Sequence, residues 1–138
     1  MDKVFVSSEW GELRECIYGA PNDLVFAKWL LDADCRPWGE FRTLWKENQG
    51  KSLKEVDPDR FERFRSQIKG AIEFLRSSGV VVHIPEPHNE WTMKFPRGEN
   101  HGDMTAWMRD PFVTIDNHVI ELAPRSLFHR RQRYPIRS

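Results

Sequence analysis

The pattern of apolar positions predicts its clearest element between residues 57 and 79. Asp57 is a good N-cap, Pro58 suits the first helical position, and Gly79 can adopt the left-handed conformation that ends a helix. Between them, apolar side chains recur at helical spacing and form one stripe, which comprises Phe61, Phe64, Ile68, Ala71, Ile72 and Leu75. We therefore expect an amphipathic helix that begins at Pro58.

Short apolar runs predict strands before and after this helix. Residues 13–18 (LRECIY) lie between turn-forming residues, and residues 80–84 (VVVHI) run directly from Gly79 to Pro85. The second run is rich in β-branched residues, which predicts a buried, central strand. Residues 112–115 and 118–122 are separated by Asp116-Asn117, a pair that tolerates positive φ angles, and together they predict a β-hairpin.

Three segments lack a clear pattern. Residues 22–56 mix aromatic and charged side chains with Pro and Gly and predict an irregular insertion, in which residues 24–31 could form two helical turns. Residues 85–108 predict a long loop, of the kind that often carries function. Residues 124–133 could begin a helix that Pro135 would interrupt.

Length and composition favour one small protein domain without a membrane partner. The chain has 138 residues, of which 39% are hydrophobic, and a mean hydropathy of -0.66. Its sequence holds no apolar run of the length that crosses a bilayer, and residues 1–10 resemble neither a secretory signal nor a transit peptide. Two cysteines are too few for a disulfide scaffold, so we expect reduced thiols and a soluble, cytoplasmic protein.

Charge is balanced overall but uneven along the chain. There are 21 basic and 21 acidic side chains, yet residues 125–138 contain five arginines and no acid. A basic tail can bind nucleic acid, whereas the simpler interpretation is a solvated surface segment. We favour the simpler interpretation and expect no nucleic acid partner.

Candidate chemistry lies where the long loop meets the hairpin. Arg109-Asp110 precedes the first hairpin strand, and a carboxylate there could bind a planar guanidinium through two parallel hydrogen bonds. The alternative is a local salt bridge between the two side chains. The five histidines lack the spacing of metal ligands, so we expect neither a metal nor a cofactor.

Two motifs resemble the glycine and inosamine-phosphate amidinotransferases. The stretch 9–19 (EWGELRECIYG) is similar to the first strand of that family, although Cys16 stands where Val is usual. Arg109-Asp110-Pro111-Phe112, followed by the 116–117 turn, Ile120-Glu121 and Arg125-Ser126, resembles a later segment of that family and, more loosely, of arginine deiminases. The two motifs occur in the same order as in the family.

The resemblance implies an α/β pentein fold, in which ββαβ-type modules form a propeller around a substrate channel. Residues 1–138 would be the N-terminal segment of such a domain, an incomplete propeller. The resemblance assigns Asp110 to the substrate guanidinium, with Arg109 beside it. The family's late nucleophilic Cys and downstream His-x-Asp are not found in this sequence, and His101-Gly102-Asp103 lies upstream of the Arg-Asp pair. Neither Cys16 nor Cys35 resembles an activated nucleophile, so we assign no catalytic residue.

The resemblance implies transfer of an amidino group from arginine to a glycine-like amine through a covalent Cys intermediate in the complete enzyme. One alternative is hydrolysis by a deiminase or dimethylarginine hydrolase. Another is a truncated fragment or binding module without the chemistry. The expected partners are arginine or another guanidino molecule, together with a C-terminal half or a second copy, since an isolated segment should expose apolar strips at Phe61, Phe64, Ile68 and Phe112.

Overall fold

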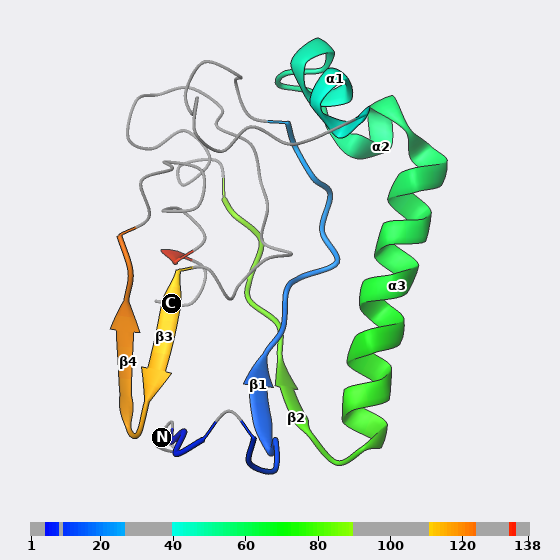
Figure 1. Ribbon diagram of the computed structural model, residues 1–138. Coiled ribbons are helices and arrows are strands. Elements are labelled where there is room, and N and C mark those ends of the chain that lie inside the picture. The colour runs from blue at the N-terminus through cyan, green and yellow to red at the C-terminus, as the bar shows by residue number, and fades with distance from the viewer. Residues whose placement is uncertain (1–4, 9, 27–39, 90–110, 124–132, 135–138) are drawn as a thin grey trace.

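The computed structural model describes residues 5–8, 10–26, 40–89, 111–123 and 133–134. The described residues form a mixed α/β structure in which the helices lie on one side and a β-hairpin on the other (Figure 1). They contain two separate two-stranded sheets and no closed barrel. The expected α/β class is confirmed at this level.

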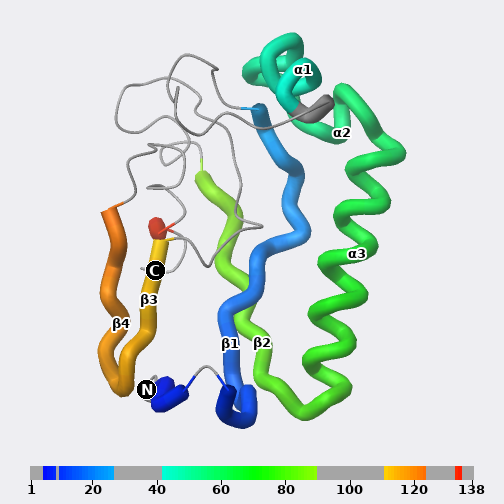
Figure 2. Tube along the Cα trace, in the orientation of Figure 1, coloured from blue at the N-terminus to red at the C-terminus, as the bar shows by residue number. Residues whose placement is uncertain are grey.

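The first sheet joins two strands that are far apart in the sequence. Strand β1 (Glu15–Ile17) pairs in parallel with β2 (Val81–His83), and Cys16 lies opposite Val82. Figure 2 shows the two strands side by side, with α3 (Pro58–Ser77) running along them. Both strands were expected from their apolar runs and are confirmed, with narrower bounds.

Helix α3 covers one face of this sheet. The buried cluster beneath it contains Ile68, Ile72, Val80 and Val82, and half-buried side chains pack around it: Cys16, Tyr18, Phe64 and Leu75. The other face is open, since Val81 is 54% exposed and Ile17 is 49% exposed. The expectation that the second strand is central and buried is therefore wrong, because β2 has one strand neighbour among the described residues and one covered face.

The ends of α3 confirm the predicted capping. The Asp57 carboxylate accepts a hydrogen bond from the Arg60 backbone N–H at 2.9 Å, and Pro58 occupies the first helical turn. Beyond the helix, Gly79 has a φ of +85°, which a residue with a Cβ rarely adopts. The chain then turns directly into β2.

The segment 22–56, expected to be irregular, is partly helical. It contains α1 (Glu40–Glu47) and α2 (Leu53–Val56), and α2 begins with a capping box between Ser52 and Glu55. The first residues of the expected 24–31 helix are extended instead. There Val25 forms an isolated bridge with Ser52, so long-range backbone pairing overrides the local helical spacing, and residues 27–31 lie outside the described residues.

A second apolar cluster explains why this segment is ordered. Phe26 is fully buried, and its ring meets that of Trp45 edge to face, with the centroids 5.6 Å apart. Leu24, Leu53 and Phe61 complete the cluster. Scattered aromatic residues that have no helical or strand period in the sequence thus meet in space around the N-terminal end of α3.

The predicted hairpin is confirmed. Strands β3 (Phe112–Ile115) and β4 (His118–Glu121) are antiparallel, with Phe112 opposite Glu121 and Ile115 opposite His118. Asp116 at the turn has a φ of 49°. The same residue pairs with Val6 through two backbone hydrogen bonds of 2.8 Å, which join the N-terminal segment to the turn.

The exposed apolar surface differs from the expected one. Phe61 and Ile68 are buried, while Phe64 and Phe112 are half-buried, so the expected exposed strips are covered. The exposed apolar side chains lie instead on the open face of the first sheet and on the hairpin, including Ile17, Val81, Val113, Ile115, Val119 and Ile120. Among the described residues, no helix has the length and apolar character needed to cross a membrane.

Candidate functional site

The Arg109-Asp110 pair, the expected substrate-binding pair, lies outside the described residues. The described residues resume at Pro111, directly after the pair, and continue to residue 123. Residues 90–108 of the expected loop lie outside the described residues, while residues 85–89 are neither helix nor strand. The candidate site is therefore built from the hairpin end that begins at Pro111.

Pro111 anchors the start of β3. It is among the most deeply buried residues, with less than 2% of its surface exposed. Its carbonyl oxygen accepts a hydrogen bond from the Leu122 backbone N–H at 2.8 Å, which ties the start of β3 to the end of β4. The backbone directly after Asp110 is thus held by burial and by a hydrogen bond.

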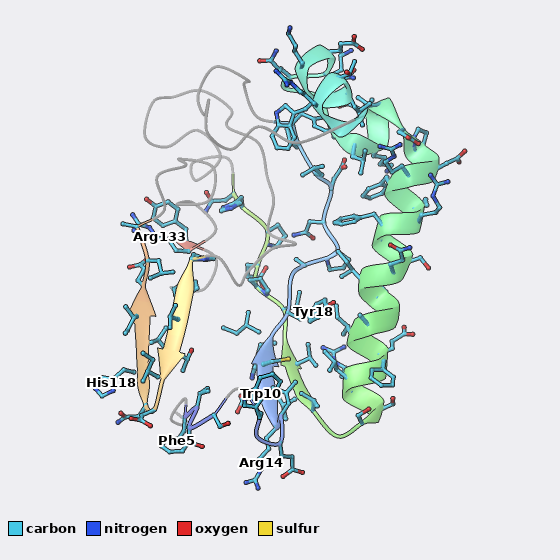
Figure 3. The ribbon with its side chains drawn as sticks, viewed as in Figure 1. Phe5, Trp10, Arg14, Tyr18, His118 and Arg133 are labelled. Atoms are coloured by element: carbon cyan, nitrogen blue, oxygen red, sulfur yellow. The ribbon has the colours of Figure 1, made fainter. Side chains whose placement is uncertain are left out.

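An ion pair lies at this same end of the hairpin. Glu121, the cross-strand neighbour of Phe112, places its Oε1 atom 3.4 Å from Nε of Arg133. The two side chains are only 28% and 24% exposed, and these two atoms are shielded from solvent. Since they do not align as a hydrogen bond, their attraction is coulombic. Figure 3 shows Arg133 beside this end of the hairpin.

The guanidinium of Arg133 also contacts an aromatic ring. Its central carbon lies 5.4 Å from the ring centroid of Tyr134, which is within the range of a cation–π interaction. In the sequence, Arg133 is one of five arginines in a basic tail and Glu121 is part of the Ile120-Glu121 motif, so neither stands out as a site residue. The register would have placed Glu121, because a two-residue turn at 116–117 sets residue 121 opposite residue 112.

Cys16 does not have the features of a nucleophile. Its side chain lies on the covered side of β1 and packs against the cluster under α3. Burial raises the pKa of the Cys16 thiol, so the thiolate fraction at neutral pH is lower than for an ordinary cysteine. Cys35 and the His101-Gly102-Asp103 lookalike lie outside the described residues.

Among the residues that the structure describes, the other titratable side chains do not gather into a cluster. His83 contacts Glu15 across the exposed face of the first sheet, and His118 lies at the hairpin turn (Figure 3). Within the described part of the chain, no group of three His, Cys, Asp or Glu side chains could hold a metal ion. A shallow hollow on the outer side of α3 is lined only by polar side chains: Asp59, Glu62, Arg63, Ser66 and Gln67.

Several features meet at this end of the hairpin. It combines an anchored strand start, a shielded carboxylate and a guanidinium next to an aromatic ring. Comparison with known proteins adds no assignment, since no protein-family model and no curated protein matches the chain.

Proposed function

We propose that this chain is the N-terminal part of an amidinotransferase-like enzyme that takes an amidino group from an arginine-like donor and transfers it to an amine. One observation carries the proposal. The Arg109-Asp110 motif directly precedes a buried Pro111 and a hairpin in fixed register, so the backbone that follows the motif is anchored. The finer fold belongs to the same proposal: a pentein propeller of which residues 1–138 form an incomplete part.

In this proposal Asp110 binds the donor guanidinium. A carboxylate can meet that planar, permanently charged group through two charge-assisted hydrogen bonds, and such pairing requires a well-oriented backbone. Arg109, the preceding residue, belongs to the same substrate-binding motif. The burial of Pro111 and its backbone hydrogen bond to Leu122 support these roles, because they fix the residue that directly follows the motif.

The proposed chemistry uses a cysteine thiolate in the complete enzyme. The thiolate sulfur bonds to the guanidino carbon, the carbon–nitrogen bond to the donor breaks, and the donor amine leaves with a proton from a general acid of the complete enzyme, which the resemblance identifies as a His. The acceptor amine then attacks the same carbon and gives its proton to that group, the carbon–sulfur bond breaks, and the thiolate is restored. Cys16 is not that nucleophile, because it is half-buried and burial raises the pKa of its thiol.

The environment of Cys16 also favours a second candidate function. In this candidate the chain is a guanidino-binding module that does not catalyse amidino transfer. The described residues contain this one cysteine, and its thiol is packed against the core. Both candidates share arginine binding at Asp110. Incubation of the complete enzyme with arginine and glycine, beside residues 1–138 alone, separates them, because only a complete transferase forms ornithine and guanidinoacetate.

Calorimetric titration of arginine tests the shared step. We expect Asp110→Asn to weaken arginine binding by about tenfold or more, because the variant loses the charge of the carboxylate and one acceptor. Asp116→Asn is the matched control, since it removes the same charge at the opposite end of the hairpin, where Asn tolerates the φ of 49°. Equal affinities in well-folded wild-type and Asp110→Asn proteins would contradict the proposal, as would the absence of arginine binding.

A further inference from the structure

The outer edges of the described strands are protected to different degrees. On β2, the Arg76 guanidinium donates a hydrogen bond to the carbonyl oxygen of Val82, at 3.1 Å, on the edge away from β1. On the outer edge of β3, Val6 and Asp116 exchange two backbone hydrogen bonds of 2.8 Å. Strand β1 is only three residues long and begins with the charged Glu15. Cover, shortness and charge are features that keep a strand edge from pairing with another molecule.

The outer edge of β4 is open at Val119. The hydrogen bond from the Leu122 N–H to the Pro111 carbonyl oxygen shows which residues of β4 bond to β3, because bonded and non-bonded pairs alternate along an antiparallel ladder. The backbone groups of His118 and Ile120 therefore point toward β3, whereas those of Val119 point away from it. Val119 is 50% exposed, and within the described part of the chain no backbone group bonds to it. Figure 1 shows β4 on the side of the hairpin away from β1 and β2.

The sequence of β4 lacks the features that keep edges apart. The strand contains neither lysine nor proline. Its acidic residue, Glu121, lies 3.4 Å from Arg133, and both side chains are about three-quarters covered, so the charge of the carboxylate is compensated. Val119, in contrast, is apolar and β-branched, which suits an extended strand with neighbours on both sides. The edge is therefore able to accept a further strand.

We propose that β4 is the surface through which two copies of this chain associate, with the two β4 strands antiparallel and Val119 of each copy opposite Val119 of the other. A two-fold axis at this residue lets the two copies exchange both backbone hydrogen bonds of Val119. The same register sets the Glu121 carboxylate opposite the Asn117 amide of the second copy, so the polar groups at both ends of the contact are complementary. The result is one four-stranded sheet with the order β3-β4-β4-β3.

Other registers of the same two strands are less favourable. An axis at Glu121 would bring two carboxylates directly opposite each other, and like charges in that position are destabilising. An axis at Ile120 would set the apolar Val119 against a carboxylate. The proposed association goes beyond the proposed function and does not depend on arginine binding.

Sedimentation equilibrium of the full chain over a wide concentration range tests the association. Contact through one short strand is small, so we expect a weak monomer–dimer equilibrium. Val119→Lys sets two ammonium groups opposite each other at the axis and should weaken the dimer by about tenfold or more. Val113→Lys is the matched control, since it makes the same change at a valine that is 41% exposed on β3, away from the contact. We expect it to leave the equilibrium unchanged.

Cysteine cross-linking tests the register in a Cys16→Val, Cys35→Ser background. In Val119→Cys the two thiols lie on directly opposite residues, whose Cα atoms would be about 5.5 Å apart, within the reach of a disulfide. In Asn117→Cys the two Cα atoms would be about 13 Å apart along the strands, beyond that reach. Mild oxidation with copper phenanthroline should therefore give covalent dimers of Val119→Cys in much higher yield than of Asn117→Cys.

The results can overturn the proposal in three ways. A wild type that is monomeric at every concentration would do so, as would equal association of wild type and Val119→Lys. Loss of the dimer in Val113→Lys with retention in Val119→Lys would place the contact on a face of the hairpin instead of its edge. Circular dichroism checks the fold of each variant. If Val119→Lys does not fold, the cross-linking decides, and equal yields from Val119→Cys and Asn117→Cys would contradict the proposal.

Discussion

Oε1 of Glu15 lies 2.5 Å from Nε2 of His83, so an acid from β1 and a histidine from β2 meet across the parallel sheet. The two residues are 68 positions apart in the chain. Their contact lies on the open face of the sheet, where both side chains are more than half exposed. Water and salt therefore screen the attraction between the two side chains. The contact is a consequence of the β1–β2 pairing and contributes little to the stability of the fold.

Removing this contact should have a small effect on stability. We expect Glu15→Gln and His83→Ala each to lower the free energy of unfolding by about 0–1 kcal/mol, as for other exposed ion pairs. Urea unfolding at neutral pH measures the change, with Glu12→Gln as a control that alters another exposed pair. A loss above about 2 kcal/mol would mean that the pair behaves as a buried one.

The second apolar cluster should depend strongly on Phe26. Its side chain is fully buried against Trp45, so Phe26→Ala removes a large apolar side chain and leaves a cavity. We expect the free energy of unfolding to fall by about 3–5 kcal/mol in urea titrations. Phe74→Ala makes the same chemical change at a side chain that is 69% exposed, and should stay within about 0.5 kcal/mol of wild type. Similar losses in the two variants would argue against this cluster.

Two glycines should respond to alanine with opposite signs. Gly79 has a φ of +85°, and an added Cβ there would meet no atom within 4 Å, so the cost of Gly79→Ala is backbone strain alone, about 1–2 kcal/mol. Gly70 lies inside α3 with open space around it, so Gly70→Ala should stabilise the protein by about 0.4–1 kcal/mol. Thermal and urea unfolding measure both changes. Stabilisation by Gly79→Ala would show that the turn into β2 is different in solution.

Cys16 should give the protein an alkaline dependence of stability. Burial raises the pKa of its thiol above the ordinary value of 9.0, so the folded state holds the proton more tightly than the unfolded chain. The resulting stabilisation is fully present below the unfolded pKa. It is lost as the pH rises from about 9 to the raised folded pKa, because the unfolded chain releases its proton first.

The Cys16→Val variant isolates that contribution. It replaces the thiol with an apolar side chain of similar size and should remove this part of the pH dependence while keeping the fold. Unfolding is compared between pH 7 and 11 in a Cys35→Ser background, so that Cys16 is the only thiol that titrates. Identical alkaline profiles for the two proteins would show that the Cys16 thiol is not buried on β1.

Much of the local structure followed from the sequence alone. The N-cap at Asp57, the apolar stripe after it and Gly79 together determined α3, because capping and helical spacing act within a few residues. The two-residue turn at Asp116-Asn117 likewise determined the hairpin and its register, since the turn length sets which residues face each other. From that register the position of Glu121 opposite Phe112 also follows.

Only the tertiary structure decided how distant segments meet. Phe26, Trp45 and Leu53 have no common period in the sequence, yet they share one buried cluster, because burial of apolar surface depends on distance in space. The open face of the β1–β2 sheet and the Glu121–Arg133 pair could not be predicted from the sequence either. Each depends on which element covers or approaches another. Local sequence thus determined the elements and the turns, whereas long-range packing determined what surrounds the anchored end of the hairpin.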